Sequence, residues 1–287
     1  MKLKKLLVFT LMTSVFVIAT TGCTLFKPTT ESLSKKYNST FENIKTADFT
    51  VDYDIKFNIT NGESGFDMGL KGNEDVDLLI DKDKTTAHSV NSATMTMFDM
   101  SETVKNDNYI VEENGESTVY TKTEEQDWVK STSEDNMATM LIKNNKINET
   151  FKMEDKTTTY NDVECYVLKG KIKSTDVLGS DFEDETSMEF DDIDLDVDIY
   201  MDKKTKNVIG MQYSISKEAF AEALKKEDTT ESASSVELNS FVIKISINDI
   251  NNDVKIDIPE EALNAKSAET VDENMTEEEN TTIEKEE

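Results

Sequence analysis

The sequence predicts a mainly β protein (α+β) with one wide antiparallel sheet and a few helices. Alternating apolar and polar residues recur along the 287-residue chain, as in strands with one dry and one wet face. Turn signals such as Asn61-Gly62 and Asn114-Gly115 separate these segments and favour hairpins between neighbours in sequence. The pattern amounts to about ten strands, and a single sheet of that width must curl or close.

Residues 1–22 have the composition of a secretory signal peptide. Three early lysines precede an apolar run from Leu6 to Ile18, and small residues end the segment. The run is shorter than the roughly 20 residues that a membrane-spanning helix needs. Residues 23–30 contain one proline, and we expect them to form a short tether between the membrane and the domain.

Residues 19–23, Ala-Thr-Thr-Gly-Cys, resemble the lipobox of bacterial lipoproteins, with Thr20 where leucine is usual. In that family the cysteine receives a diacylglyceryl group and becomes the mature N-terminus. The resemblance implies that Cys23 is lipidated and anchors the protein to the extracytoplasmic face of the cell membrane. A plain signal peptide with a chance cysteine is the alternative. All 31 basic residues are lysines, which indicates an AT-rich genome and, with the lipobox, a Gram-positive bacterium.

Residues 31–46 predict an amphipathic helix packed on the sheet. Their apolar residues are spaced by four, four and three, which places them on one helical face: Leu33, Tyr37, Phe41 and Ile44.

The segment ADFTVDYDIKFNIT, residues 47–60, predicts a long strand. Its odd positions are apolar and its even positions are polar; the apolar side chains are Phe49, Val51, Tyr53, Ile55, Phe57 and Ile59. Residues 64–80 continue this pattern after a hairpin, residues 85–104 are strand-like, and residues 108–132 predict a meander.

The second half of the chain predicts further strands and two short helices. Ser131 and Glu134 have capping-box spacing ahead of a helix through Leu141. Three strands over 147–172 precede an acidic loop, 174–187, and a second helix is expected over 217–227. The last strand, 236–250, changes phase between Leu238 and Phe241, which predicts a bulge.

These elements form one predicted domain, residues 31–263, followed by an acidic tail, 264–287, which cannot bury a core and is expected to be disordered. The net charge of −29 and the absence of arginine disfavour nucleic acid as a partner. Lipidation of Cys23 leaves Cys165 as the remaining thiol, so packing rather than a disulfide must hold the fold.

The segment DDIDLDVD carries a row of carboxylates on one strand face: Asp192, Asp194, Asp196 and Asp198. Carboxylates are the hard ligands that calcium prefers, but the sixth position of an EF-hand loop requires a glycine, and Val197 stands there. A solvated strand face is therefore favoured, with weak binding of divalent cations as an alternative.

Other residues could bind a metal or take part in catalysis, but the sequence shows no second group that would act with them. Met95, Met97 and Met100 could bind cuprous ion or supply adaptable apolar lining, and the second role is favoured. His88 is the only histidine, and no HExxH, GxSxG, Walker A or CxxC pattern accompanies it. We therefore expect no enzyme activity, no catalytic residue and no cofactor.

The order of the elements resembles that of LolA-like and LppX-like lipoproteins of bacteria. The matching stretches are ADFTVDYDIKFNIT, WVKST, VECYVLKGKI, DIYMDKKTKNVIGMQYSISK and KIDIPEEALNA. The resemblance implies an incomplete β-barrel whose concave apolar face is covered by helices and, in relatives, holds acyl chains. The family has no catalytic residues to carry over.

The resulting first hypothesis is a membrane-anchored protein that binds a lipid or another hydrophobic ligand in the half-barrel. The expected lining is Phe49, Val51, Tyr53, Ile55 and Phe57, with a helix carrying Leu33, Tyr37 and Phe41 as the cover. The alternative is a filled core with a regulatory or protein-binding role for the outer surface, the protein partner being unknown. An enclosed apolar cavity would distinguish the two.

Overall fold

A computed structural model describes residues 27–61, 64–82, 84–98, 100–114, 116–133, 146–174, 193–226 and 234–267. Its helices within these ranges are α2 (Thr30–Glu42), α6 (Lys217–Lys226) and α7 (Glu260–Leu263). Its strands are β1 (Thr46–Asn61), β2 (Ser64–Asp81), β3 (Lys84–Met97), β4 (Met100–Glu113), β5 (Glu116–Thr123), β6 (Val129–Ser133), β7 (Lys152–Met153), β8 (Thr158–Tyr160), β9 (Val163–Lys173), β10 (Asp194–Asp202), β11 (Val208–Ser214), β12 (Ser234–Ile250) and β13 (Lys266–Ser267).

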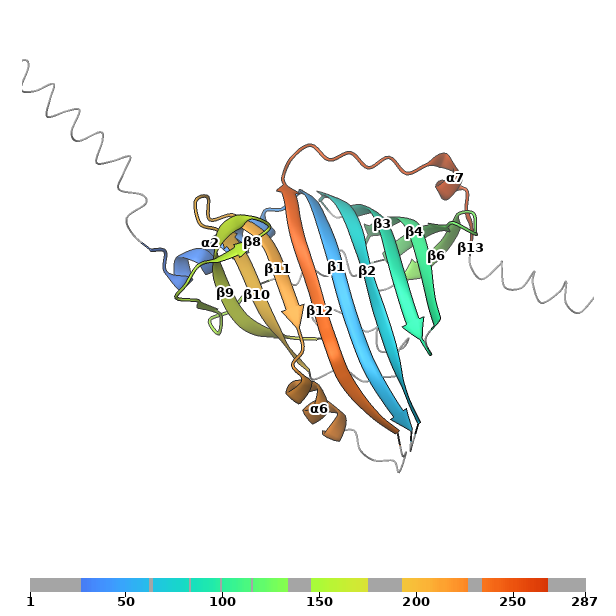
Figure 1. Cartoon of the computed structure of the whole chain (residues 1–287). Coiled ribbons are helices and arrows are strands. Elements are labelled where there is room, and N and C mark those ends of the chain that lie inside the picture. Colours follow the sequence, from blue (N-terminus) through green and yellow to red (C-terminus); the bar gives the residue numbers. More distant parts are fainter. Residues whose placement is uncertain are drawn as a thin grey trace, which may run out of the picture.

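These strands form one sheet, in the order β13-β6-β5-β4-β3-β2-β1-β12-β11-β10-β9-β7, with β8 also paired to β9. Among the described pairings, β13 with β6 is parallel and the others are antiparallel. The sheet curves strongly, so that both of its sides recede behind the central strands β12 and β1 (Figure 1). The predicted mainly β class, with one large antiparallel sheet and few helices, is confirmed.

The strict alternation of residues 47–60 produces the central strand β1. Cross-strand pairs share a sheet face, so the pairs Tyr53↔Ile243 and Ile55↔Phe241 place the apolar side chains of β12 on the same face as those of β1. The pairing then jumps from Lys56↔Ser240 to Phe57↔Leu238, which skips Asn239. This shift is the bulge that the change of phase predicted, and it keeps Leu238 and Phe241 both on the apolar face.

The apolar face is the concave one, and α2 packs against it. Thr29 caps α2 by accepting a hydrogen bond from the Ser32 backbone N–H at 3.2 Å, and the Ser32 hydroxyl accepts one from the Thr29 N–H at 3.1 Å. The helix ends at Glu42, earlier than the predicted residue 46, and Ile44 is buried in the segment that follows it.

Two predicted elements of the first half differ from the structure. The strand-like stretch 85–104 is two strands, β3 and β4, joined by a tight turn at Phe98, whose φ is 52°. Ser131, expected to cap a helix, lies in β6, and the rest of that predicted helix lies in residues 134–145, outside the described ranges.

The chain continues past the predicted end of the domain. After β12 it crosses to the far edge of the sheet (Figure 1), where α7 precedes β13. Lys266 and Ser267 of β13 pair with Val129 and Lys130 of β6. Residues 268–287, like the predicted signal peptide and Cys23, lie outside the described ranges. In the part of the chain that the structure describes, no helix is long and apolar enough to span a membrane.

Candidate ligand-binding face

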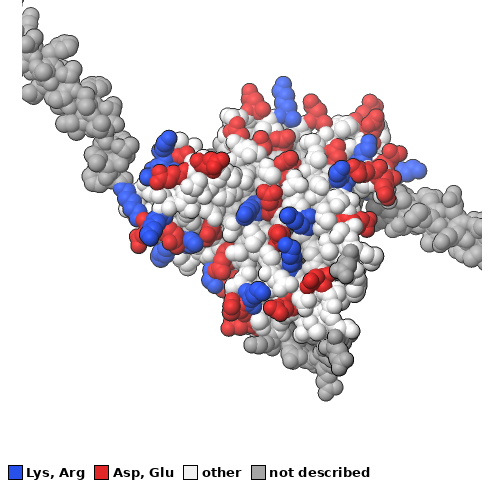
Figure 2. All heavy atoms as spheres, viewed as in Figure 1, with Lys and Arg blue, Asp and Glu red and all other residues white. Residues whose placement is uncertain are grey.

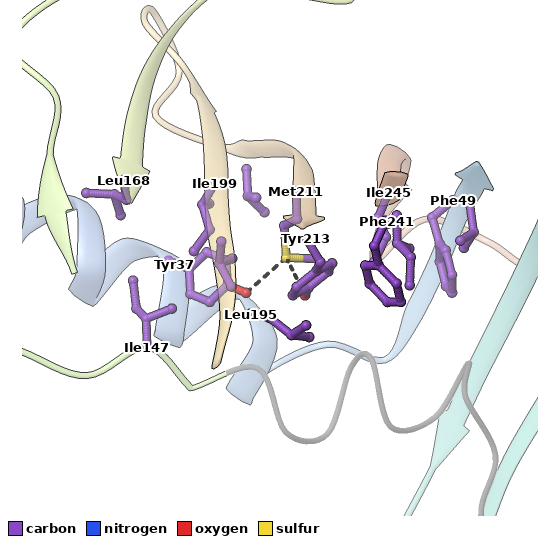
Figure 3. Close-up of a cluster of buried hydrophobic side chains, with 14 of the residues drawn as sticks. Tyr37, Phe49, Ile147, Leu168, Leu195, Ile199, Met211, Tyr213, Phe241 and Ile245 are labelled. Carbon is purple, nitrogen blue, oxygen red and sulfur yellow. Dashed lines mark hydrogen bonds between the residues drawn. The ribbon is translucent and has the colours of Figure 1, made fainter. Parts of the chain in front are cut away.

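The half of the concave face beneath α2 is closely packed. Leu33 and Tyr37 of α2 are each only 1% exposed, and they meet apolar side chains of β9 to β12 (Figure 3). The Tyr37 hydroxyl donates to the Met211 sulfur at 3.1 Å, and the Tyr213 hydroxyl approaches the same atom at 3.6 Å. Burial raises the pKa of both tyrosines, so both hydroxyls stay protonated and can donate.

An apolar cavity beneath α2 has a volume of about 10 Å³, roughly one water molecule. It is lined by Phe41, Ile44, Ala47, Phe49, Met211, Ile245, Ile247 and Ile250. Of the predicted lining residues, Phe49, Val51, Ile55, Phe57, Leu33 and Tyr37 are buried in the core, whereas Tyr53 and Phe41 are partly buried. Their role in binding a ligand stays a prediction.

The other half of the concave face leaves apolar side chains open to solvent near the β3–β4 turn. The register places Met97 between Met68 of β2 and Met100 of β4, and it places Met95 beside Leu70. Met95, Met97 and Met100 are 55%, 39% and 67% exposed. We call the concave-face residues Phe66, Met68, Leu70, Met95, Met97, Met100 and Val104 the methionine patch. At its edge, the ring of Phe98 stacks on Phe66 with centroids 4.1 Å apart.

A band of polar side chains separates the methionine patch from the closed core. Glu74, Asn91 and Asn106 are successive cross-strand neighbours on β2, β3 and β4, and Ser89 and Asn108 form the next row. We call these five residues the polar band. The Asn108 amide donates to the Ser89 hydroxyl at 3.4 Å. The side-chain oxygens of Asn91 and Asn106 are buried, and neither has a hydrogen-bond partner within the described residues.

The carboxyl group of Glu74 is the ionisable group of the polar band. Burial raises its pKa above the ordinary value, and a hydrogen bond from Ser89 opposes this shift. The nearby phenol of Tyr53 lies over Gly72, where a Cβ would be 2.6 Å from the Tyr53 Cζ atom. The pKa of Tyr53 is raised by burial and by the Glu74 charge.

The polar band was not among the predicted site residues, although the sequence carries a signal for it. The concave-face residues of β2 are apolar at 66, 68, 70, 76, 78 and 80, and Glu74 interrupts this series. Asn91 interrupts the corresponding face of β3, between Ala87 and Met95. A polar residue where the alternation of the strand calls for an apolar one therefore marked the polar band in the sequence.

The predicted acidic row lies on the convex face and is paired with lysines of β9. Asp194, Asp196 and Asp198 lie 3.1, 3.5 and 3.3 Å from the amino groups of Lys173, Lys171 and Lys169. Asp192 lies outside the described ranges. Among the residues that the structure describes, no group of three or more histidine, cysteine or acidic side chains could hold a metal ion.

His88 lies on the convex face among aromatic residues. Its Nε2 is 2.9 Å from an Asp107 carboxylate oxygen, and its ring stacks on Tyr109 with centroids 4.4 Å apart. Tyr109 in turn contacts Trp128 at 5.6 Å. Trp128 lines a cleft of about 720 Å³ between the turn after β5 and α7. Charges of both signs are interspersed over the convex face (Figure 2). Cys165 is buried, and its thiol donates a hydrogen bond to the Val163 carbonyl at 3.2 Å.

No protein-family model matches the chain. No curated protein matches it by sequence. Distant structural similarity was found to a DUF1329 family protein from Desulfovibrio piger, with 10% identity, coverage of 78% of this chain and 92% of that chain, and a TM-score of 0.24. A domain from Vibrio parahaemolyticus named for outer-membrane lipoprotein sorting shows 6% identity, coverage of 81% and 95%, and a TM-score of 0.22.

A LolA superfamily protein from Nitrosomonas europaea is similar at 7% identity, with coverage of 81% of this chain and 96% of that chain and a TM-score of 0.22. The similarity to LolA superfamily and lipoprotein-sorting structures is distant, and no sequence family matches the chain.

Proposed function

We propose that the protein is a lipid-anchored, extracytoplasmic binding protein without catalytic chemistry, and that it holds a hydrophobic ligand on the open half of its concave face. The observation that carries this proposal is the methionine patch. The register aligns its side chains from three adjacent strands, and Met95, Met97, Met100 and Val104 are 39% to 67% exposed. Glu102 lies beside Met95 on the same face, and a cluster of exposed apolar side chains rimmed by polar residues is typical of a binding site.

The chemistry of the patch fits an acyl chain or a similar flexible apolar group. Methionine is unbranched and polarisable, so it adapts to ligands of irregular shape. The patch borders the closed half of the face, because the buried side chains of Phe57 and Ile55 are the cross-strand neighbours of Met68 and Leu70. The binding surface therefore lies on β2 to β4 rather than under α2.

The experiment uses the mature chain without its anchor, residues 24–287, so that acyl groups on Cys23 do not interfere. Native mass spectrometry after expression in a lipid-containing host should detect a bound species, which lipid extraction would identify. The variant Met95→Gln/Met97→Gln should bind about tenfold more weakly, because it removes apolar contact at similar side-chain length. Val90→Thr is the matched control, since Val90 is 49% exposed on the convex face.

An unchanged affinity in the double variant, or an equal loss in the control, would contradict this placement of the ligand. The anchor is tested separately in the full chain, where Cys23→Ala should abolish incorporation of labelled palmitate. Incorporation that survives this substitution would contradict lipidation at Cys23.

A second candidate function is a protein-interaction module with a filled core. The tight packing beneath α2 favours it, and the cleft beside Trp128 offers a site for a partner on the outside of the sheet. A mature chain that purifies empty and ignores added amphiphiles would favour this candidate. Trp128 is the only tryptophan, so its fluorescence would report a partner that enters the cleft.

A further inference from the structure

The polar band lies at the inner end of the methionine patch, on the same three strands. Along β3, Met97, Met95, Ala93, Asn91 and Ser89 follow one another on the concave face, from the exposed turn towards the core. A ligand whose apolar tail lies on the patch and points towards the turn would place its polar head at Asn91. The band and the patch therefore form one amphipathic surface.

The unpaired groups of the polar band are hydrogen-bond acceptors. Within the described residues the buried side-chain oxygens of Asn91 and Asn106 have no hydrogen-bond partner, which is unfavourable for a buried polar group. The two residues are direct cross-strand partners, so their Cβ atoms are about 5 Å apart. Glu74, Asn91 and Asn106 are each partly exposed as residues, although the two amide oxygens themselves are buried.

The charge of this face has one sign. Glu74 is the cross-strand neighbour of Asn91, and Glu102 and Glu112 occupy the concave face of β4. By register, the concave-face positions of β12, β1, β2, β3, β4 and β5 within the described residues hold no lysine. A phosphate or carboxylate head would find no cation at these positions, because they hold no lysine and the chain has no arginine.

We propose that the polar band is a headgroup subsite that selects an amphiphile with a positively charged, hydrogen-bond-donating head, such as a primary ammonium group. The N–H groups would donate to the free oxygens of Asn91 and Asn106, and the Glu74 carboxylate would balance the charge. The proposal rests on the function proposed above, because the tail needs the methionine patch.

The test compares four amphiphiles with the same twelve-carbon tail, each below its micelle concentration, by calorimetric titration of residues 24–287 at about 150 mM salt. Dodecylammonium has charge and N–H donors, dodecyltrimethylammonium has charge alone, dodecyl maltoside is neutral, and dodecyl sulfate is anionic. Dodecylammonium should bind about tenfold more tightly than dodecyltrimethylammonium, because only its N–H groups can donate to the buried acceptors. Dodecyl sulfate should bind most weakly.

Glu74→Gln should lower the dodecylammonium affinity about tenfold and leave dodecyl maltoside unaffected. Asp75→Asn is the matched control: it removes the same charge from the next residue of β2, which is exposed on the convex face and hydrogen-bonded to Thr50. An equal loss of dodecylammonium affinity in both variants would mean that the overall negative charge attracts the ligand, and it would overturn the proposed headgroup subsite. Thermal melts of both variants check that the fold is intact.

The two proposals fail in different ways. If all four amphiphiles bind with equal affinity, the apolar patch holds the ligand and the headgroup subsite is wrong. If none of them binds, the proposed function is wrong, and the subsite falls with it. If the double methionine variant loses binding of all four, but Glu74→Gln changes only the preference between heads, both proposals are supported.

Discussion

Gly210 of β11 lies beneath the ring of Tyr160, whose hydroxyl reaches the Ile245 carbonyl at 3.2 Å. A Cβ at this position would be 2.6 Å from the Tyr160 Cζ atom and 2.8 Å from the Ile245 carbonyl oxygen. The backbone oxygen cannot move without disturbing the β11–β12 ladder. The glycine thus allows the hairpin of β8 and β9 to fold onto the convex face.

We expect Gly210→Ala to lower the free energy of unfolding by about 1–3 kcal/mol, as overpacking typically does. Gly69→Ala is the control, because its nearest contact would be Lys56 Cγ at an ordinary 3.6 Å, and its effect should stay within about 0.5 kcal/mol. Chemical denaturation of both variants measures the difference. Equal stabilities would show that Tyr160 is not held against the sheet in solution.

Glu74 makes the stability of the fold depend on pH. Its folded-state pKa is raised above 4.5, so the folded protein binds the proton more tightly than the unfolded chain does. The carboxyl group therefore contributes stability below pH 4.5, which is lost as the pH rises through the raised pKa. Tyr53 is the other titratable group that interacts with it, and it stays neutral throughout this range.

The difference in unfolding free energy between Glu74→Gln and the native chain should grow as the pH rises from about 4 to 7 and favour the variant at the upper end. Denaturant titrations at several pH values measure it. A difference that is constant with pH would mean that Glu74 is not buried in the folded state.

At the scale of elements, a ladder of three Lys–Asp ion pairs joins the adjacent strands β9 and β10. Its side chains are mostly 47–58% exposed, with Asp198 at 25%. Exposed pairs of this kind contribute about 0–1 kcal/mol each, because solvent and salt screen them. The apolar residues of β10 that alternate with the aspartates, Leu195 and Ile199, are fully buried and hold the strand in place.

Asp196→Asn should therefore change the free energy of unfolding by less than about 1 kcal/mol. Addition of millimolar calcium should leave the melting temperature unchanged, because lysines already neutralise Asp194, Asp196 and Asp198. A calcium-dependent rise in melting temperature that Asp196→Asn removes would instead support the weak cation site.

Elements were predictable from the sequence where one physical signal dominated. The alternation of apolar and polar residues in β1 and the change of phase at Asn239 both follow from the two-residue period of a strand, and both predictions are confirmed. The turn between β3 and β4 was not predictable, because Phe98 adopts a left-handed φ without a glycine, asparagine or proline to signal it. The division of the concave face into closed and open halves depends on which strands α2 covers, and this long-range contact leaves no local pattern.

At the scale of the whole molecule, the net charge of −29 opposes compaction, since like charges repel more strongly in the folded chain. Raising sodium chloride from about 20 mM to about 500 mM should therefore raise the melting temperature, because the shorter Debye length screens this repulsion. Differential scanning calorimetry measures the shift. A melting temperature that falls with salt would mean that the ion pairs outweigh the net repulsion.

The edges of the sheet affect whether copies of the protein aggregate with one another at high concentration. A long, bare edge strand is a template for another chain, and repeated addition of strands leads to aggregates. Here the terminal strands in the described sheet, β13 and β7, have two residues each. Neither terminal strand is therefore a long template for another copy, which favours a protein that stays dispersed although its methionines are exposed.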